Sequence, residues 1–385
     1  MAGPRSFEVI VLGTGGMGSA AAYHLAKNGH RVLGLDRFPG GHNRGSSHGE
    51  TRIIRKAYFE HPDYVPLLQR AYGLWSDLES ETGQQLYFET GLIEIGPPDG
   101  IVVPGVIRAA KQHGLPLEKI ERTDFPNRFP SMRLPENHLA VFEKEAGFLR
   151  VEDCVRAHLD LAQRHGAEFE FDAAVTGWSA DESGVTVKTE KGEEFRGDAL
   201  IVTTGAWSAP MMAELGMPLR IVRAHLHWFE CGQQNSMEAG CPCFFYETEN
   251  SGGAFYGFPA IDDLGLKVAE HDGRTEIFHD PLEDPDTPES EDSARVRDFV
   301  DAHFSDVHTN RRTRHVRCFY SQSPDGHFII DRHPEHGNVV FGAGFSGHGF
   351  KFASVVGEHL ANLAVQAETN PSFDFLGLRR NAGQF

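Results

Sequence analysis

The chain has 385 residues, a formal net charge of −19 at pH 7 and 40% hydrophobic residues. The length is enough for two domains with a large core, and the strong negative charge argues against nucleic acid or an anionic membrane as a partner. No apolar stretch approaches the roughly 20 residues that span a bilayer, and no signal peptide precedes the first apolar run, so we expect a cytoplasmic protein.

The cysteines and histidines do not form a metal-binding pattern. An odd, sparse set of five cysteines favours reduced thiols. Cys241 and Cys243, on either side of Pro242, lack the second pair of ligands that a zinc site needs. The 21 histidines are spread along the chain without metal-ligand spacing. We therefore expect no metal site. The cysteines are Cys154, Cys231, Cys241, Cys243 and Cys318.

The first 36 residues carry the clearest pattern. Residues 7–12 form an apolar, β-favouring run, the sequence GTGGMG follows at 13–18, and residues 19–28 read as a helix of small side chains. A second strand at 31–35 ends at Asp36. A glycine turn between strand and helix, with an acid after the next strand, is the fingerprint of dinucleotide binding.

Each residue type in this turn has a physical role. Gly13 permits the tight turn, Gly15 lets a pyrophosphate approach the backbone, and Gly18 lets the helix pack closely on the strand. The helix N-terminus offers unpaired N–H groups to the phosphates. Asp36 can accept hydrogen bonds from ribose hydroxyls and would repel the extra phosphate of NADP. The motif alone does not separate FAD from NAD.

The rest of the chain alternates helical and β patterns. A loop rich in Gly and Ser at 37–49 is expected near the cofactor, a hairpin at 181–184, a solvated loop at 280–292 and a second glycine-rich turn at 342–349. Helices are expected at 64–78, 105–113, 151–163, 294–304 and 350–367. Strands are expected at 87–95, 169–194, 199–207, 218–231, 243–247, 254–260, 316–320, 327–331 and 338–341.

This order predicts an α/β protein with a discontinuous nucleotide-binding domain, into which a β-rich α+β domain is inserted in two pieces. We assign residues 1–80, 146–214 and 316–385 to the nucleotide domain, and 81–145 and 215–315 to the second, substrate-binding domain. Ligands bind preferentially at such interfaces.

Five segments then resemble a known family. They are GSSHGETRIIR at 45–55, YGFP at 256–259, GLK at 265–267, RCFY at 317–320 and GFSGHGFK at 344–351. Together they resemble the monomeric sarcosine oxidase and N-methyltryptophan oxidase family, FAD-dependent amine oxidases of the D-amino-acid oxidase group. The resemblance is collinear from about residue 7 to residue 364. It implies a Rossmann-type FAD-binding domain, covalently held FAD, a monomer, and oxidation of a secondary amine that bears a carboxylate.

The resemblance changes the interpretation of Cys318. A lone Cys in a β run is usually a small buried hydrophobe. The family attaches its flavin through a Cys in this segment, so the resemblance implies that Cys318 is the covalent anchor. Arg314, His315 and Arg317 would favour the reactive thiolate if they faced it.

The resemblance also assigns three cations. Arg55 and Lys351 would be expected at the surface from sequence alone, but they match the family pair that binds the substrate carboxylate. Lys267 lies in an apolar stretch, from which a Lys normally reaches water. It matches the family Lys that stands by the flavin and promotes reaction with O2. Arg52 resembles a cation near the flavin ring, and Thr51 a residue that flanks it.

The remaining expected residues follow the same matches, and no dedicated catalytic base is implied. Tyr256, His271 and His348 match residues of the reaction pocket, in addition to Lys267 and Arg52. Thr51, Phe245 and Tyr320 are expected beside the substrate. The expected cofactor contacts are Gly13, Gly15, Gly16, Met17, Gly18, Asp36, Arg37, Ser46, His48, Thr51, Arg52, Val175, Thr204, Gly205, Trp207, Cys318, Gly344, Gly347, His348, Gly349 and Lys351.

Some positions depart from the family. Lys56 stands where close relatives usually carry His, and the segments RAHLHW at 223–228 and FFY at 244–246 match poorly. Phe245 and Tyr246 are bulky for a pocket whose best substrate is sarcosine. These departures leave the substrate side chain open.

We expect an FAD-dependent oxidase that demethylates N-methyl amino acids with O2, giving the free amino acid, formaldehyde and H2O2. The alternative is a flavin oxidase or dehydrogenase of another carboxylate-bearing amine, such as a cyclic imino acid, an opine or a sugar-amino acid. A third hypothesis is a non-catalytic flavin-binding subunit. The joint presence of Arg55, Lys267, Cys318 and Lys351 argues against that third hypothesis.

Overall fold

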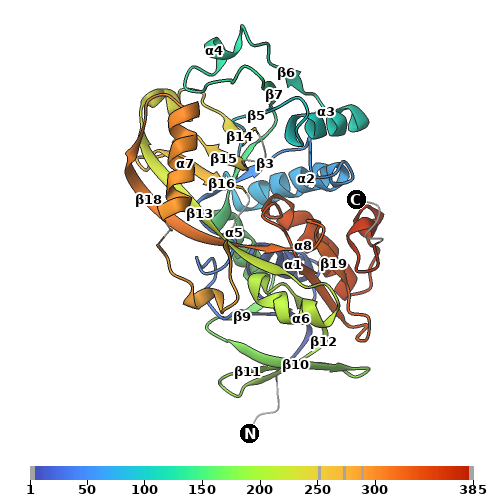
Figure 1. Ribbon diagram of the computed structural model, residues 1–385. Coiled ribbons are helices and arrows are strands. Elements are labelled where there is room, and N and C mark those ends of the chain that lie inside the picture. Colours follow the sequence, from blue (N-terminus) through green and yellow to red (C-terminus); the bar gives the residue numbers. More distant parts are fainter. Residues whose placement is uncertain (1–4, 250–252, 272–274, 288–289, 381–385) are drawn as a thin grey trace.

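The computed structural model describes residues 5–249, 253–271, 275–287 and 290–380 (Figure 1). Two large sheets dominate it, one built around the N-terminal strand and the other around the middle of the chain. The structure also contains a small three-stranded sheet. The described helices are not long and apolar enough for any of them to cross a membrane.

The first sheet is the expected nucleotide-binding sheet. Its strand order is β10-β11-β12-β1-β2-β9, with β20 beside β12 and β19 beside β20. The pairs β1–β2, β1–β12, β2–β9 and β12–β20 are parallel. The strand bounds are β1 Arg5–Leu12, β2 Val32–Leu35, β9 Glu168–Glu170, β10 Val175–Asp181, β11 Gly184–Thr189, β12 Glu194–Val202, β19 Ile329–Arg332 and β20 Val339–Ala343.

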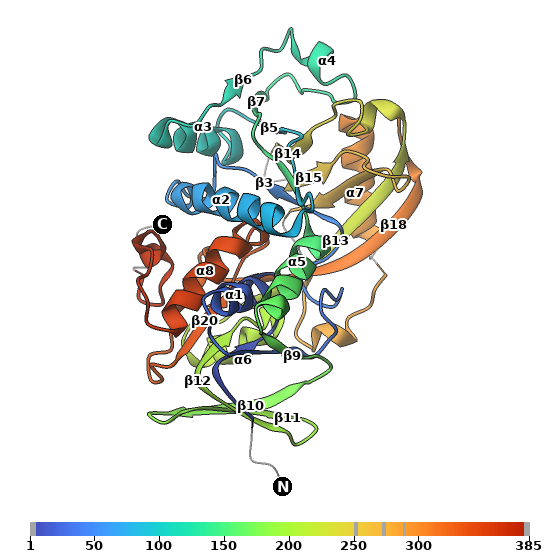
Figure 2. The ribbon, with the colours of Figure 1, turned by 180° about the vertical axis from the view of Figure 1, so that it is seen from behind.

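Three helices cover this sheet. In Figure 2, α1 (Gly16–Lys27), α5 (Val151–Arg164) and α8 (Ala353–Ala364) lie side by side, and α1 packs on both of the others. Their buried faces are rich in Ala and Gly, as at Ala20 and Gly357, so the helices approach closely. The parallel sheet with these helices confirms the α/β fold expected from the sequence.

The second sheet is mostly antiparallel, with the order β17-β13-β16-β15-β14-β5-β7-β6 and β18 beside β13. Helix α7 (Ser290–His303) packs on β18 and β16, and α3 (Val102–His113) packs on β5 and β7. The strand bounds are β5 Leu92–Gly96, β6 Glu118–Lys119, β7 Leu139–Glu143, β13 Arg220–Cys231, β14 Cys243–Glu247, β15 Ala254–Phe258, β16 Leu266–Glu270, β17 Thr275–Glu276 and β18 Val307–Gln322.

The small sheet joins the two cores. It consists of β3 (Thr51–Ile54), β8 (Gly147–Arg150) and β4 (Tyr87–Phe88). Alternate side chains of β3 belong to different cores, because Ile54 packs in the core beneath α1 and Ile53 in the core of the second sheet. This arrangement holds the segment around Arg52 between the two large sheets. The other helices are α2 (Tyr64–Thr82), α4 (Phe125–Arg128) and α6 (Ala209–Glu214).

Among the differences from the sequence prediction, two concern β18 and the loop at 280–292. Strand β18 is 16 residues long, whereas the sequence predicts only 316–320 as a strand, because residues 307–314 are mostly polar and their strand form depends on pairing with β13. The expected domain division between 315 and 316 falls inside this strand. The loop at 280–292 is also less solvated than predicted, since Asp284 is only 5% exposed and accepts a 3.0 Å hydrogen bond from Arg223.

Candidate active site

The glycine turn after β1 has the geometry that the fingerprint requires. Gly13 has φ +85°, and a Cβ there would lie 2.6 Å from the Thr203 carbonyl oxygen. A Cβ on Gly18 would lie 1.9 Å from the Gly13 oxygen, so the helix can approach the strand only with glycine here. Gly15 faces open space, with Ser47 Oγ at 3.8 Å from an added Cβ. The turn therefore leaves room for a pyrophosphate at the start of α1.

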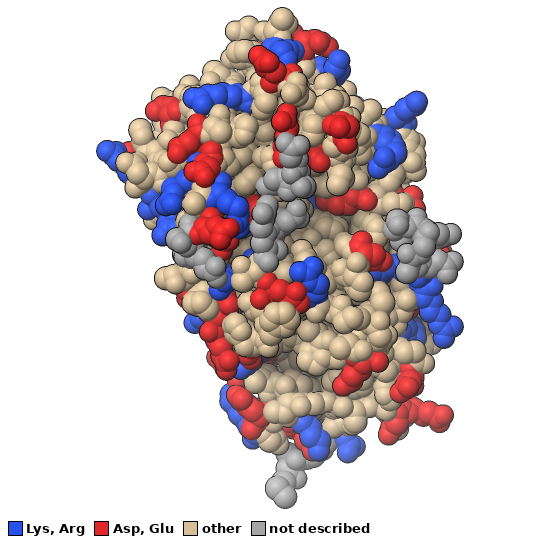
Figure 3. Space-filling view, in the orientation of Figure 1, with Lys and Arg blue, Asp and Glu red and all other residues tan. Residues whose placement is uncertain are grey.

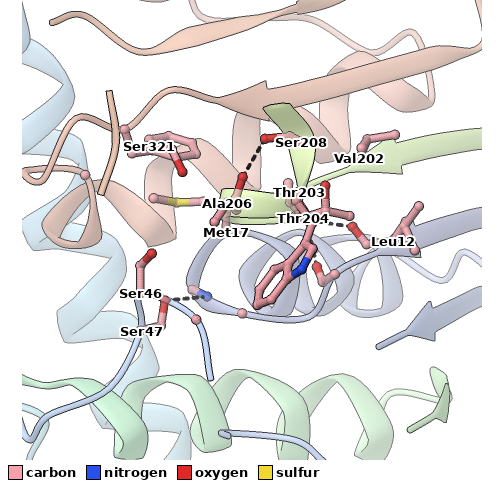
Figure 4. Close-up of a pocket in the computed structure, with 18 of the residues that line it drawn as sticks. Leu12, Met17, Ser46, Ser47, Val202, Thr203, Thr204, Ala206, Ser208 and Ser321 are labelled. Carbon is pink, nitrogen blue, oxygen red and sulfur yellow. Dashed lines mark hydrogen bonds between the residues drawn. The ribbon is translucent and has the colours of Figure 1, made fainter. Parts of the chain in front are cut away.

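Ser47 is a polar group at this turn that the sequence analysis did not select. The Gly16 N–H donates to Ser47 Oγ at 3.1 Å, as Figure 4 shows, so the serine hydroxyl satisfies a free donor at the N-terminus of α1. On the other side of the turn, Thr203 Oγ1 donates to the Gly13 carbonyl at 2.7 Å. These two contacts fix the turn from both sides.

Asp36 lies at the end of β2 and is held in place by its neighbours. Its Oδ2 accepts from the Thr14 N–H at 2.7 Å and from Thr14 Oγ1 at 3.0 Å, and its Oδ1 accepts from the Phe38 N–H at 3.0 Å. The carboxylate lines the same cavity as the glycine turn. This is the position that a ribose-binding acid requires.

A single cavity of about 1190 Å³ runs from this turn to the second sheet. Most of the expected site residues lie on its wall: Gly13, Gly15, Gly16, Met17, Asp36, Arg37, Ser46, Arg52, Arg55, Val175, Thr204, Gly205, Trp207, Phe245, Tyr256, His271, Tyr320, Gly344, Gly347, His348, Gly349 and Lys351. Five expected residues lie behind the wall: Gly18, His48, Thr51, Lys267 and Cys318.

Asp280 links two of the expected cofactor residues at the nucleotide end. It accepts a hydrogen bond from Arg37 Nη1 at 3.3 Å and another from Trp207 Nε1 at 3.2 Å. The acidic segment that was predicted as a solvated loop therefore contacts two residues of the cavity wall. Sequence reasoning could not find this contact, because the partners are separated by 243 and 73 positions.

Cys318 and Arg52 are in direct contact. The Arg52 Nη2 group donates to Cys318 Sγ at 3.4 Å and to the Ser46 carbonyl at 2.9 Å. The expected neighbours of the thiol point elsewhere: Arg314 pairs with Glu50, and Arg317 pairs with Asp284 on the opposite face of β18. The positive charge beside the sulfur therefore comes from Arg52.

Lys267 is buried behind Thr51. The side chain is 2% exposed, and its Nζ donates to the Gly49 carbonyl at 2.5 Å and to the Thr51 carbonyl and hydroxyl at 3.0 Å each. Burial, and then the charge of Arg52, lowers the pKa of Lys267 well below its ordinary value. The ammonium also lies 4.6 Å from the centre of the Phe258 ring. The side chain therefore does not reach water, as a Lys in an apolar stretch usually does.

Arg55 is paired with a carboxylate that the sequence analysis missed. Its Nη2 donates to both oxygens of Glu60, at 2.8 and 2.7 Å, and its Nη1 donates to the Ala57 carbonyl. Burial alone would raise the pKa of Glu60, but the charges of Arg55 and nearby groups outweigh burial and lower it to about 2. The only sequence signal was an acid five positions after Arg55 in an apolar segment.

Glu94 is a second missed acid beneath Arg55. It is fully buried on β5, its Oε1 lies 3.5 Å from Arg55 Nη1, and neither oxygen has a hydrogen-bond partner among the described residues. Burial raises the pKa of Glu94 to about 8, so this carboxyl is protonated at neutral pH. The ion pair at Arg55 is therefore made with Glu60 and not with Glu94.

Lys351 lies on the cavity wall near Arg55. Its Nζ donates to the His348 carbonyl at 2.8 Å and contacts the Tyr58 hydroxyl at 3.4 Å. Burial, and then the charge of Arg55, lowers the pKa of Lys351 from 10.5 to about 7. In the part of the chain that the structure describes, Lys351 forms no ion pair with a carboxylate, so it can accept an anionic group from the cavity.

Aromatic side chains form the rest of the wall at this end. The Tyr256 and Tyr320 hydroxyls lie 3.2 Å apart, and the Phe245 and His271 ring centres 5.0 Å apart. Burial lowers the pKa of His348 to about 3, so its ring is neutral, and its Nδ1 lies 2.6 Å from the Tyr58 hydroxyl. No strong base faces the cavity from these side chains.

One expectation about this wall is wrong. Of the three residues 244–246, only Phe245 reaches the cavity. Side chains alternate along β14, so Phe244 and Tyr246 pack in a separate core against Phe299 of α7. Tyr246 therefore does not restrict the substrate.

The parallel sheet, the glycine turn and the cavity define a dinucleotide-binding protein with a second sheet over the far end of its ligand site. A family model described as FAD dependent oxidoreductase matches residues 8–363, and the chain belongs to this family. The observed turn and cavity fit FAD, because Gly15 leaves space for the pyrophosphate and Asp36 lies where the adenosine ribose needs an acceptor.

Similar proteins agree with this family. The chain is 40% identical to the monomeric sarcosine oxidase of Streptomyces avermitilis over 98% of both chains, and 39% identical to that of Bacillus sp. (strain NS-129) over 98% of this chain and 97% of the relative. It is 35% identical to the N-methyl-L-tryptophan oxidase of Citrobacter koseri, over 97% of this chain and 98% of the relative.

Solved structures share the fold at lower identity. NikD, an unusual amino acid oxidase essential for nikkomycin biosynthesis, superposes with a TM-score of 0.83 at 23% identity over 97% of both chains. Glycine oxidase from Geobacillus kaustophilus gives a TM-score of 0.78 at 19% identity, over 98% of this chain and 100% of that chain. Among the described residues, no group of three or more His, Cys, Asp or Glu side chains is arranged to hold a metal ion.

Proposed function

We propose that the protein is an FAD-dependent oxidase of secondary amines that demethylates N-methyl amino acids. The balanced reaction consumes the N-methyl amino acid, O2 and water, and yields the free amino acid, formaldehyde and H2O2. The observation that carries the proposal is the position of Arg55 and Lys351. They are 296 positions apart in sequence, yet both are buried on the wall of the cavity that begins at the glycine turn.

The two cations bind the substrate carboxylate. Arg55 offers a planar fork and Lys351 a point charge, which together suit a carboxylate at a buried site. Glu60 now occupies the fork of Arg55, so the substrate carboxylate replaces Glu60 there. The aromatic wall of Phe245, Tyr256 and Tyr320 contacts the apolar part of the substrate and excludes water.

The substrate amine reacts in its neutral form, because only then does nitrogen have a lone pair to support cleavage of the adjacent C–H bond. The neutral ring of His348 adds no charge beside it. FAD, when bound, supplies the two-electron acceptor of the reaction. The chain needs no dedicated catalytic base for this chemistry; Arg52, Tyr256, His271 and His348 orient the amine in the cavity.

Cys318 is the proposed covalent attachment point for FAD. Its sulfur contacts Arg52 and lies 3.7 Å from the Ser46 carbonyl, and both of these residues line the cavity. A cation beside a sulfur stabilises the thiolate that forms a thioether. Lys267 is the proposed oxygen-activating group. Its Nζ donates to three oxygens, which favours the ammonium form against the effect of burial, and a positive charge beside the flavin stabilises superoxide during electron transfer.

The other cofactor roles follow the cavity. The first glycine turn, Asp36, Arg37, Val175, Thr204, Gly205 and Trp207 hold the adenosine pyrophosphate end. The reacting end is lined by Ser46, Gly344, Gly347 and Gly349, and His48 and Thr51 support it from behind the wall. We further propose that the protein is a cytoplasmic monomer with a discontinuous FAD domain. Because β18 pairs along β13, we move the proposed last division from residue 315 to the end of β18 at Gln322.

Phe245 supports a second candidate within the same chemistry. Its ring stands between Phe59 and His271 on the substrate wall, with ring centres 5.1 and 5.0 Å away, and contributes apolar area beyond what a methyl group needs. A flavin oxidase or dehydrogenase of a larger carboxylate-bearing amine, such as a cyclic imino acid, opine or sugar-amino acid, would use that area.

An anaerobic screen tests the proposal. Purified protein is mixed without oxygen with sarcosine, other N-methyl amino acids, proline, pipecolate and opines, and loss of flavin absorbance is followed. N-methyl amino acids should bleach the flavin fastest, and air should then restore the colour with formation of H2O2. Bleaching only by a cyclic or opine substrate would favour the second candidate, and bleaching without reoxidation by air would indicate a dehydrogenase. No bleaching by any amine would contradict both.

A further inference from the structure

A separate cavity of about 410 Å³ lies on the other face of the second sheet, between α7 and the strands β13 and β18. Strand alternation separates the two sites: Leu226 and Trp228 face the core beside the cofactor cavity, whereas His227 faces α7. The cavity is lined by His227, Phe229, Thr287, Ser293, Arg297, Thr309, Asn310 and Arg312.

His227 is a buried polar group without a partner. Its side chain is 1% exposed, and within the described residues neither ring nitrogen has a hydrogen bond. The ring is stacked on that of Phe229, with the ring centres 6.0 Å apart. Burial, followed by the charges around it, lowers the pKa of His227 to about 2, so the imidazole is neutral and has one N–H to donate. A buried donor left unpaired is costly, so a ligand in the cavity would satisfy it.

Two arginines give this cavity a positive charge. Arg297 comes from α7 and Arg312 from β18, and in the described parts of the chain neither forms an ion pair with an Asp or Glu, although the protein has a net charge of −19. Arg312 Nη1 donates to Ser293 Oγ at 3.4 Å. No carboxylate is present among the described residues that line the cavity. Figure 3 shows Lys and Arg side chains on this side, over α7 and β18, with Asp and Glu side chains among them.

We propose that this cavity is a binding site for a small dianionic oxyanion of the phosphate or sulfate type. Arg297 and Arg312 supply two positive charges, which match a dianion, and the neutral His227 ring, the Ser293 hydroxyl and the Asn310 amide supply further polar contacts. The same guanidinium groups repel metal cations. A bound anion links α7 to β18 and thereby stabilises the contact between helix and sheet.

Calorimetric titration of the FAD-loaded protein with inorganic phosphate and with sulfate, at pH 8 and constant ionic strength, tests the site. Wild type should bind one anion per chain in the millimolar range or tighter, and acetate and chloride should bind at least 10-fold more weakly. Arg312→Gln should weaken phosphate binding at least 10-fold.

Arg311→Gln is the matched control, because Arg311 is next in sequence but its Nη1 pairs with Glu230 on the surface at 2.7 Å. It removes the same charge and should leave phosphate affinity unchanged. His227→Phe keeps a ring on Phe229 and should keep the melting temperature without anion, while it weakens phosphate binding.

Three results overturn the proposal: no saturable binding of phosphate or sulfate by wild type, equal weakening in Arg311→Gln and Arg312→Gln, or unchanged binding in both Arg312→Gln and His227→Phe. Acetate binding as tight as phosphate would overturn the assignment of a dianion. A gradual rise in melting temperature with salt does not support the site, because excluded anions stabilise proteins without binding.

Discussion

Single side chains on the cavity wall differ in how firmly they hold their charge. Arg55 stays ionised because guanidinium groups do not lose their proton in proteins and because Glu60 stabilises it. Lys351 has no such partner among the described carboxylates, and its pKa falls to about 7. The two halves of the proposed carboxylate site therefore respond differently to pH and to substitution.

Carboxylate binding should weaken as pH rises through about 7. Below its pKa Lys351 is an ammonium and attracts the anion; above it, the neutral amine does not. Acetate has no group that titrates in this range, so its dissociation constant, measured by the change in flavin absorbance, should rise from pH 6 to pH 9. Lys351→Gln should bind acetate at least 10-fold more weakly at pH 6 and lose the dependence near pH 7, keeping only the one that ionisation of Glu94 causes near pH 8. The same pH dependence in the variant would contradict this role.

Glu60→Gln should improve substrate binding and reduce stability. The amide competes less with the substrate carboxylate for Arg55, so KM should fall about 10-fold with kcat little changed. The buried guanidinium loses its charged partner, so the free energy of unfolding should fall by about 3 kcal/mol. Steady-state kinetics and urea unfolding measure the two effects. An increased KM would mean that Glu60 assists binding instead of competing with it.

Lys267→Met should separate the two halves of the catalytic cycle. Reoxidation of reduced protein by O2, followed by stopped-flow absorbance, should slow by roughly 100-fold or more, because the fixed charge is lost. Anaerobic reduction by substrate should change much less. Equal slowing of both steps would indicate that Lys267 acts only by holding Thr51 and Gly49 in position.

At the scale of the element, the turn between β1 and α1 depends on the absence of side chains. The turn approaches Thr203, the residue after β12, and the start of its own helix so closely that backbone atoms fill the space of a Cβ. Sequence reasoning found this element because its rules are local: a strand, three glycines and a helix within 30 residues. The bounds of α1, α2, α5 and β14 were predicted to within a few residues for the same reason.

Gly18→Ala should disrupt the turn, because the new Cβ would lie 1.9 Å from a backbone oxygen that no side-chain rotation can move. We expect lower flavin content per protein, measured by the ratio of absorbance near 450 and 280 nm, and a lower melting temperature. Gly73→Ala is the control: it lies within α2 with no atom within 4 Å of the added Cβ, and should raise stability by up to about 1 kcal/mol. Normal flavin content in Gly18→Ala would contradict the prediction.

The elements that sequence reasoning missed depend on distant partners. Residues 307–314 have no apolar alternation, and they extend β18 only because β13 supplies hydrogen bonds along the whole strand. Glu60 and Glu94 look like any surface acids in the sequence, since nothing local reveals that Arg55 lies against both of them. The error at Tyr246 has a different origin, because the strand at 243–247 was predicted but the direction of its faces was not considered.

For the whole molecule, the two sheets contribute to one cavity from opposite sides. The glycine turn belongs to the eight-stranded sheet, whereas Cys318 belongs to β18 of the nine-stranded sheet. The sequence indicated that both sheets contribute to the site. The family resemblance assigned residues 45–55, 256–259 and 344–351 to one site, and these segments can form one site only if the fold brings them together. The sequence did not give the exact residue at which one domain ends and the next begins, because β18 runs across the expected boundary between residues 315 and 316.

Cys318→Ala should release the flavin when the whole molecule unfolds. Wild type denatured in acid should keep its yellow colour with the precipitated protein, whereas the variant should leave the colour in the supernatant. The substitution removes one buried sulfur, so the folded variant should still bind FAD through the glycine turn. Release of the flavin from acid-denatured wild type would refute covalent attachment at this residue.

The position of Cys318 on the second sheet affects how the protein would retain its cofactor in dilute solution. If Cys318 holds the cofactor covalently, as proposed, an opening of the cavity that frees the glycine turn would not let the cofactor diffuse away. Recapture is then an intramolecular event at an effective concentration of the order of millimolar, far above that of free FAD in most surroundings. Under this proposal, loss of the cofactor would require cleavage of the bond to Cys318, which dilution does not cause.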